Sequence, residues 1–287
     1  MKVLITGANG QLGRALQMMQ PAQAEVVAFM RDALDITDRA AVTQAIARNR
    51  PDWVINAAAY NAVDAAETER EAAFAVNAHG PRFLAEALAR HGGRLIHVST
   101  DFVFTGDQTR AYRPEDPVAP LGAYGESKAA GEAAVREVLP DHHLLMRTAW
   151  VYDGEGHNFV STMLALMRQR REINVVDDQI GTPTRACGLA FALWTAIAKN
   201  LSGTHHWTDA GVASRYDFAC AIYAIGRGIG RVSAPVVIRP VPSSSFPTPA
   251  RRPAFSVLDK TATWAALEAT PVHWCDALRL ALADGRI

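Results

Sequence analysis

Cysteine is scarce in this sequence of 287 residues, and the few cysteines are widely spaced. There are three, Cys187, Cys220 and Cys275, an odd number without a CxxC pair. This spacing argues against a disulfide framework and against a zinc site, so we interpret the cysteines as packing residues in a reducing compartment. No clustered set of His, Cys, Asp and Glu predicts any other metal site.

Net charge and long apolar runs are also absent. Basic and acidic residues number 29 each, which gives no electrostatic reason to expect nucleic acid or an anionic membrane as a partner. No run reaches the roughly 20 apolar residues of a membrane-spanning helix, and the N-terminus does not resemble a signal peptide. We therefore expect a cytoplasmic protein with neither nucleic acid nor membrane as a partner.

Strand-like and helix-like patterns alternate over the first half of the chain. Apolar runs typical of strands cover residues 2–6, 25–30, 53–56, 94–99 and 143–147. Helical patterns lie between them at residues 12–19, 38–49, 72–90 and 121–139. This alternation predicts an α/β protein with a Rossmann-type, doubly wound parallel sheet that binds ligands at the carboxyl ends of its strands.

The alternation loosens after Trp150. Helices are expected near residues 158–171, 186–199, 214–226 and 273–284, with short strands at 173–176 and 236–238. The proline-marked stretch 235–253 is read as a loop over a site, a joint between helices or a plain surface connection. We expect a dinucleotide-binding Rossmann domain over residues 1–150. A smaller α/β C-terminal region over 151–287 is expected mainly to bind substrate, without excluding interleaving of the two.

Three glycines mark the segment between the first predicted strand and the first predicted helix. Gly7, Gly10 and Gly13 stand in GANGQLG, where backbone N–H groups at a helix N-terminus can hold a dinucleotide pyrophosphate. A tight turn without a ligand is the plainer alternative, but the flanking strand and helix favour a cofactor site.

The residue that follows the second predicted strand bears on the choice of cofactor. A Rossmann site that selects NAD usually has an acidic residue here, whereas Arg31 can pair with a 2′-phosphate. The neighbouring Asp32 leaves NADH open, and Arg31 is equally compatible with a solvated loop charge. We predict NADPH as the cofactor, with NADH as the alternative.

Tyr124 and Lys128 form YGESK near the start of a predicted helix, with their side chains on one face. A nearby ammonium favours the phenolate and lowers the pKa of a tyrosine from about 10, which suits acid–base catalysis. A surface pair without a catalytic role is the alternative.

Thr100 and Asp101 follow the fourth predicted strand, at the edge where ligands bind, whereas strand alternation directs Ser99 to the opposite side. Asp101 is expected to contact substrate or to cap the following turn.

With these residues placed, the sequence resembles the dTDP-4-dehydrorhamnose reductase family, a branch of the extended short-chain dehydrogenases. The matching segments span nearly the whole chain: GANGQLG from Gly7, LDITD from Leu34, PDWVINAAAY from Pro51, AVDAAE from Ala62, VN at Val76, STDFVF from Ser99, YGESK from Tyr124, RTAWVY from Arg147, DDQIGTPT from Asp177 and RRPAFSVLD from Arg251. Single motifs recur among sugar-nucleotide epimerases and reductases, but STDFVF together with RTAWVY and DDQIGTPT is narrower.

The resemblance implies NAD(P)H-dependent reduction of the 4-keto group of dTDP-4-dehydro-L-rhamnose to dTDP-L-rhamnose. It implies that Tyr124 donates the proton, that Lys128 is its electrostatic partner and that Thr100 tunes both. Asp101 and Trp150 become sugar contacts, although Trp150 alone would be read as core. The implied cofactor contacts are Gly10, Gln11, Leu12, Asp35, Ile36, Ala57, Ala58, Ala59, Tyr124 and Lys128. Without the resemblance, Thr182–Thr184 reads as a strand end followed by a helix cap.

The sequence also departs from the family pattern. Ala65 and Asn61 replace a lysine and a threonine that are common in relatives, and Ala15 replaces an acidic residue that helps some members bind magnesium between two subunits. We therefore expect activity without a metal, and a monomer or weak homodimer.

Two alternatives stay open. One is another sugar-nucleotide reductase or epimerase of the same fold. The other is a cofactor-binding regulatory subunit without catalysis, although Thr100, Tyr124 and Lys128 together favour an enzyme.

Overall fold

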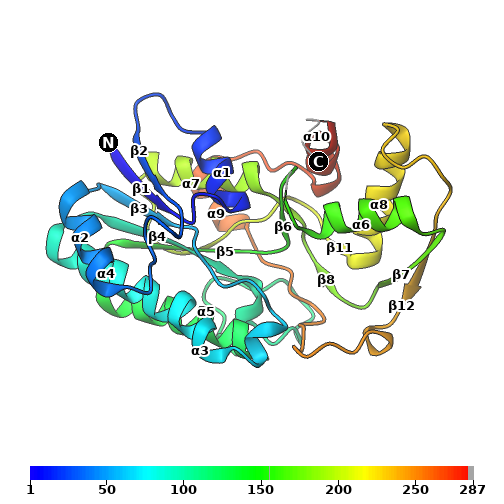
Figure 1. Ribbon diagram of the computed structural model, residues 1–287, viewed down its shortest axis with the longest axis horizontal. Helices are drawn as coiled ribbons and strands as arrows, with labels where there is room; N and C mark the ends of the chain where they lie inside the picture. Colours follow the sequence, from blue (N-terminus) through cyan, green and yellow to red (C-terminus); the bar gives the residue numbers. More distant parts are fainter. Residues whose placement is uncertain (155, 284–287) are drawn as a thin grey trace.

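A six-stranded parallel sheet forms the centre of the computed structural model, which describes residues 1–154 and 156–283 (Figure 1). The strand order is β2-β1-β3-β4-β5-β10, and all neighbours run parallel. The strands are β1 (Lys2–Thr6), β2 (Glu25–Phe29), β3 (Trp53–Asn56), β4 (Arg94–Thr100), β5 (His143–Thr148) and β10 (Gly203–His206). The order reverses between β1 and β3, and such a reversal opens a crevice at the carboxyl ends of the strands.

Helices cover both faces of this sheet, as the alternating pattern predicts (Figure 1). On one face lie α1 (Gln11–Met18), α7 (Ala186–Ala198) and α9 (Thr261–Leu267). On the other lie α2 (Arg39–Asn49), α4 (Gly80–His91) and α5 (Ala123–Val138). Within β1, Val3 and Ile5 pack toward α1 and α7, while Leu4 packs toward α2 and α4. This alternation explains why the strand is apolar throughout: both of its faces are buried.

The helix predicted over residues 72–90 is interrupted in the structure. It consists of α3 (Arg70–Phe74), a π-helical turn η2 (Ala75–His79) and α4. Pro81 lies in the first turn of α4 and has no backbone N–H to continue a regular ladder. In the wide turn, the side chain of Asn77 exchanges hydrogen bonds with the backbone N–H and C=O of Tyr60, at 2.9 and 3.0 Å. The π turn therefore fixes the segment that follows β3.

Most of the chain after Trp150 forms a second cluster of elements beside the sheet (Figure 1). They are β6 (Val151–Tyr152), α6 (Phe159–Gln169), β7 (Glu172–Val176), β8 (Ile180–Gly181), β9 (Thr184–Arg185), β11 (Ala213–Ser214), α8 (Arg215–Gly228), β12 (Val237–Val241) and α10 (Trp274–Ala283). Short 3-10 turns lie at η1 (Ala65–Glu67), η3 (Asp101–Val103) and η4 (Ser243–Ser245). Phe218, Ile222 and Leu278 lie at the centre of a separate core for this part.

Several expectations for this part need correction. The strand expected at 236–238 is present as β12, which pairs in parallel with β7, so the stretch 235–253 is more than a connection. Thr184 does not cap a helix: α7 follows Arg185, which makes no side-chain cap hydrogen bond. The helix α9 was not expected, since its seven residues are too few to show a helical period. Over the described residues, no helix is long and apolar enough to cross a membrane.

Candidate active site

The glycine-rich turn between β1 and α1 is shaped by close backbone contacts. Gly7 has φ +68°, and a Cβ there would lie 2.7 Å from the backbone nitrogen of Ala58. A Cβ on Gly13 would lie 2.2 Å from the carbonyl oxygen of Gly7. Gly10 is the N-cap of α1 and supplies no side-chain cap, so the N–H groups that open the helix at Gln11 and Leu12 face a bare end. Such an end fits a phosphate group.

An open pocket of about 520 Å³ adjoins this turn, lined by Asn9, Met30, Arg31, Asp32 and Asp35. Asp35 is oriented by Thr37, whose backbone N–H and hydroxyl donate to Oδ1 at 2.9 and 2.8 Å. These hydrogen bonds lower the pKa of Asp35. Ile36 instead packs its side chain inward, where a Cβ on Gly80 would lie 2.6 Å from its Cδ1. The pocket thus places Arg31 and a fixed carboxylate beside the glycine turn.

Thr100, Tyr124 and Lys128 are placed by neighbouring elements, the end of β4 and the first two turns of α5. The Thr100 hydroxyl hydrogen-bonds with the Tyr124 hydroxyl and donates to Asp101 Oδ1 at 3.0 Å. It also accepts from the backbone N–H of Phe102 at 3.2 Å, and the Phe102 ring meets Tyr124 edge-on with 5.6 Å between centroids. These contacts fix the phenol at the carboxyl edge of the sheet.

The pKa of Tyr124 differs from the sequence-based expectation. Burial raises it to about 12, with a lowering contribution from Thr100 and a raising one from Asp101. The ammonium of Lys128 does not offset this burial, and it donates to the carbonyl oxygen of Val98 at 2.6 Å. Burial lowers the pKa of Lys128 to about 8, against the opposing effect of Glu132. At neutral pH Tyr124 therefore holds its proton and Lys128 is mostly charged.

A buried ion pair stands behind this group, and the sequence analysis missed it. Glu132 and Arg147 pair through two hydrogen bonds of 2.8 and 2.7 Å, with side chains 0% and 2% exposed. Ser99, from β4, lies near Glu132 and lowers its pKa, although the Ser99 hydroxyl has no hydrogen-bond partner among the described residues. Asn77, from the π turn, donates to the hydroxyl of Ser127 at 3.0 Å. The face of α5 that carries Lys128 is thereby held against the sheet.

Asp101, Trp150 and Arg215 form a second group of side chains next to Thr100. Asp101 is only 2% exposed, and burial raises its pKa to about 6 despite hydrogen bonds to Ser256 and Thr100. Trp150 is partly exposed, with φ +48°, and its ring lies against Gly181, where a Cβ would be 2.7 Å from Cε2. The guanidinium of Arg215 stacks on the same ring, 3.6 Å from its centroid. Arg215 is another residue that sequence reasoning missed, since nothing in its surroundings along the chain marks it.

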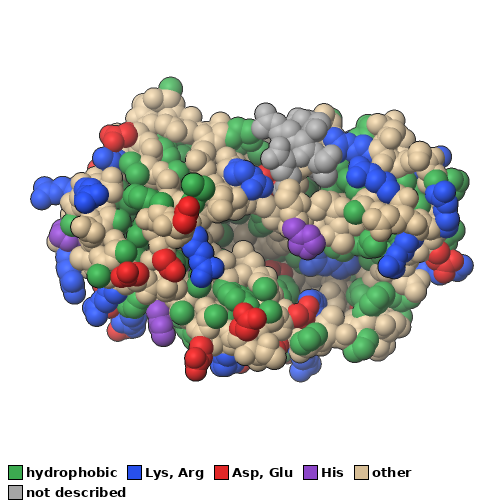
Figure 2. Space-filling view, in the orientation of Figure 1, with side chains coloured by type: hydrophobic (Ala, Val, Ile, Leu, Met, Phe, Trp, Pro, Cys, Tyr) green, Lys and Arg blue, Asp and Glu red, His purple; other side chains and the backbone are tan. Residues whose placement is uncertain are grey.

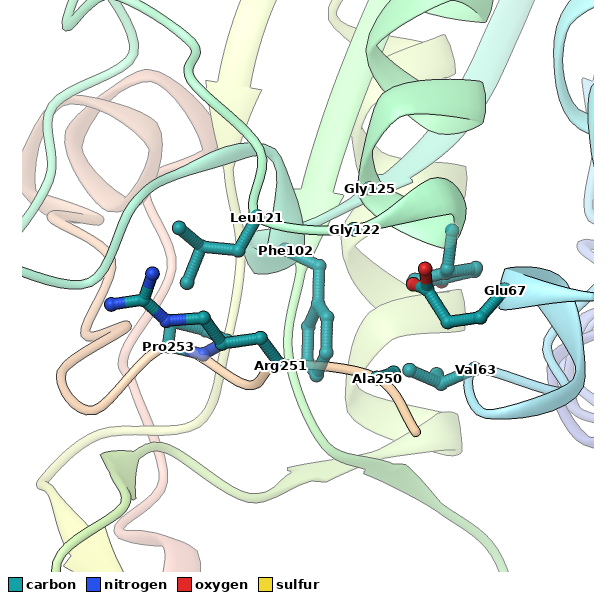
Figure 3. A pocket seen from close by; sticks show the side chains of 10 residues that line it. Val63, Glu67, Phe102, Leu121, Gly122, Gly125, Ala250, Arg251 and Pro253 are labelled. Carbon is teal, nitrogen blue, oxygen red and sulfur yellow. The ribbon is translucent and has the colours of Figure 1, made fainter. Parts of the chain in front are cut away.

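The space beside Tyr124 is narrow and crossed by two loops. A pocket of about 10 Å³ lies between Glu67 and Val63 on one side and Leu121 and Arg251 on the other, with Phe102 between them (Figure 3). An ion pair of 2.8 Å between Arg252 and Asp64 joins the loops that carry Arg251 and Val63. Figure 2 shows a hollow in this face of the molecule, with basic and histidine side chains at its edge.

Ala15 lies where some relatives carry an acidic residue. It is 1% exposed and packed between α1 and α7, where a carboxylate would lose its hydration. Over the described part of the chain, no group of three or more His, Cys, Asp and Glu residues could hold a metal ion.

Comparisons with known proteins agree with this geometry. The family model described as RmlD substrate binding domain matches residues 1–287. A dTDP-4-dehydrorhamnose reductase of Burkholderia thailandensis is 43% identical, with 91% of each chain covered. A dTDP-4-keto-6-deoxy-D-glucose reductase of Streptomyces niveus is 40% identical, with 96% of this chain and 94% of that protein covered.

Solved structures show the same likeness over the whole length. A dTDP-4-dehydrorhamnose reductase of Bacillus anthracis, in complex with NADP, superposes with a TM-score of 0.93 at 36% identity and covers 99% of both chains. A reductase of the same name from Clostridium acetobutylicum reaches a TM-score of 0.94 at 37% identity, with both chains fully covered.

Proposed function

This chain belongs to the RmlD substrate binding domain family, and from that membership and its site we propose that it is a dTDP-4-dehydrorhamnose reductase. It reduces the 4-keto group of dTDP-4-dehydro-L-rhamnose to a hydroxyl, with NADPH as the electron donor. The observation that carries the proposal is the contact of Tyr124 with Thr100 at the carboxyl edge of the sheet, with Lys128 one turn further along α5.

The residues around the glycine turn fit a dinucleotide. Gly7 and Gly13 leave room that a side chain would fill, and the bare N-terminus of α1 at Gln11 and Leu12 suits a pyrophosphate. The pocket that contains Arg31 and Asp35 is of a size to hold an adenosine ribose, where Arg31 pairs with a 2′-phosphate. Gly10, Ile36, Ala57, Ala58 and Ala59 complete the cofactor contacts that we propose.

The chemistry of the proposed site divides between cofactor and chain. Bound NADPH supplies the hydride that adds to the sugar carbonyl carbon. Tyr124 donates its hydroxyl proton to the carbonyl oxygen, and the raised pKa of about 12 keeps that proton in place at neutral pH until charge develops on the oxygen. Thr100 hydrogen-bonds to the same oxygen. Lys128 holds the nicotinamide ribose, and its positive charge favours the phenolate that Tyr124 leaves behind.

The sugar contacts that we propose lie on the other side of Thr100. Asp101 is buried and retains an oxygen, Oδ2, without a hydrogen-bond partner among the described residues, so it can accept from a sugar hydroxyl. Trp150 is partly exposed and is held by the turn after β5, with Arg215 stacked on its ring. We further propose that residues 1–150 bind the cofactor and that residues 151–287 mainly bind the substrate. The two parts interleave, because β10 and α7 pack with the central sheet.

A second candidate substrate is favoured by one relative. The Streptomyces niveus protein is named for the reduction of dTDP-4-keto-6-deoxy-D-glucose, which differs from the proposed substrate in sugar configuration and not in the reacting group.

Oxidation of NADPH tests the proposal. The wild-type protein is assayed with dTDP-4-dehydro-L-rhamnose, with dTDP-4-keto-6-deoxy-D-glucose, and with UDP- and GDP-linked 4-keto sugars. We expect the highest kcat/KM with dTDP-4-dehydro-L-rhamnose. A higher kcat/KM with another sugar nucleotide would make that compound the substrate in place of dTDP-4-dehydro-L-rhamnose. If none of these compounds supports oxidation of NADPH or NADH, a regulatory cofactor-binding protein would be favoured.

A further inference from the structure

Arg215 is the first residue of α8, and its backbone is fixed on both sides. Ser214 before it is the N-cap, and the capping box with Asp217 closes with hydrogen bonds of 2.9 Å. The backbone N–H of Arg215 donates to the carbonyl of Gln179 at 3.3 Å. The side chain leaves this fixed point and lies between two rings, 3.6 Å from the centroid of Trp150 and 5.3 Å from that of Phe159.

The guanidinium of Arg215 is half-buried and has no polar partner on the described part of the chain. Among the described residues, no hydrogen bond or ion pair to its side chain is present. Burial lowers its pKa to about 10, so it stays charged at neutral pH, and Arg252 acts in the same direction. The charge of Asp101 raises the pKa of Arg215, although the two side chains share no hydrogen bond. A half-buried guanidinium that is stacked on an aromatic ring and makes no hydrogen bond to the chain keeps its N–H donors for a ligand.

The stacking defines what that ligand can be. With one face of the guanidinium against Trp150, its N–H groups point outward in the plane, where two oxygens of a phosphate can accept them side by side. We propose that Arg215 binds the phosphate of the substrate that is bonded to the sugar, and so helps the site to select a nucleoside diphosphate sugar. The inference rests on the proposed function, in which Trp150 contacts the pyranose, because this phosphate is joined to that ring through one oxygen.

A different role is consistent with part of the same geometry. Arg215 could merely hold the indole of Trp150 in place, or keep Asp101 ionised through its charge. Under either role, replacement of Arg215 would weaken sugar binding or turnover, although Arg215 would make no contact with a phosphate. The two kinds of role separate when ligands without the sugar are used, since dTDP carries both phosphates and dTMP lacks the outer one.

Calorimetric titration of Arg215→Gln with dTDP and with dTMP is the test. A charge-assisted hydrogen bond contributes about 1.5–3 kcal/mol, so the Kd for dTDP is expected to rise about 10- to 100-fold. The Kd for dTMP should rise less than about threefold. With the full substrate, KM for the keto-sugar should rise with the Kd for dTDP, whereas KM for NADPH should not change.

Two variants serve as controls. Arg239→Gln removes an exposed guanidinium that pairs with Glu172 at 2.7 Å, and it should leave both affinities unchanged. Arg215→Lys keeps the charge but not the planar pair of donors, so it should fall between wild type and Arg215→Gln. If Arg215→Gln does not fold, the Kd values of Arg215→Lys for dTDP and dTMP provide the comparison with wild type.

An unchanged Kd for dTDP, or equal losses for dTDP and dTMP, would overturn the assignment of Arg215 to the outer phosphate. Failure of the proposed function has a different signature, because the wild-type protein itself would then neither bind dTDP nor reduce the keto-sugar.

Discussion

Replacement of Lys128 by methionine is expected to make the protein more stable and much less active. Lys128 is 2% exposed, and burial lowers the pKa of its ammonium from the ordinary 10.5 to about 8. At about 1.4 kcal/mol per pKa unit, keeping the buried amine charged at pH 7 costs about 3 kcal/mol of folding free energy. The lost hydrogen bond to Val98 offsets about 1 kcal/mol of the gain. Lys128→Met should therefore raise the free energy of unfolding by about 2 kcal/mol.

The gain in free energy of unfolding of Lys128→Met over wild type should become smaller as the pH rises above about 8. Below pH 8 the lysine is protonated in both the folded and the unfolded chain, so the wild-type protein bears the full penalty. Between pH 8 and 10.5 the folded chain has released the proton that the unfolded chain still holds, and the penalty shrinks as the pH rises. The advantage of Lys128→Met should accordingly be largest near pH 7 and fade toward pH 10.

Urea unfolding at pH 7, 8.5 and 9.5 measures this difference. Lys199→Met is the matched control, because Lys199 lies at the surface in an ion pair with Glu268 of 2.8 Å, and its loss should change stability by less than about 0.5–1 kcal/mol. A Lys128→Met protein that is less stable than wild type at pH 7, or whose advantage grows with pH, would refute the reasoning about the buried ammonium.

Three further predictions follow from other contacts. Glu132→Ala should lower the free energy of unfolding by about 3–5 kcal/mol, because it leaves the Arg147 guanidinium buried and unpaired; a loss below about 1 kcal/mol in urea unfolding would argue against this. Trp150→Phe should raise KM for the keto-sugar while the Tm stays within a few degrees, and a collapse in Tm with normal KM would make Trp150 a core residue. Arg31→Ala should raise KM for NADPH more than KM for NADH, and equal effects on the two would remove Arg31 from the 2′-phosphate site.

The sheet and its flanking helices could be predicted because local patterns coincide with burial. Strands such as β1 are apolar on both faces, and Gly7 and Gly13 are required by contacts within one short turn. The interrupted helix around Asn77 gave no such signal, since its π turn depends on hydrogen bonds to Tyr60, which lies on another segment.

The residues of the candidate site could be named from the sequence, but their pKa values could not. YGESK places Tyr124 and Lys128 on one helical face, yet the pKa of Tyr124 rises because burial, together with the charge of Asp101, outweighs the effect of nearby donors. Arg147 and Arg215 look alike in sequence, as single basic residues without a charged neighbour on either side. Only the fold shows that Arg147 is paired with Glu132 and that Arg215 is stacked on Trp150.

The most direct test of the central claim is the single-turnover rate of Tyr124→Phe with NADPH and dTDP-4-dehydro-L-rhamnose. General acid catalysis contributes roughly 10²- to 10⁴-fold, so the rate of NADPH oxidation should fall by about that factor. The Kd for NADPH should stay within about twofold of wild type, because phenylalanine keeps the ring and the other proposed cofactor contacts remain. A folded Tyr124→Phe protein that binds NADPH and reduces the keto-sugar at the wild-type rate would contradict the account.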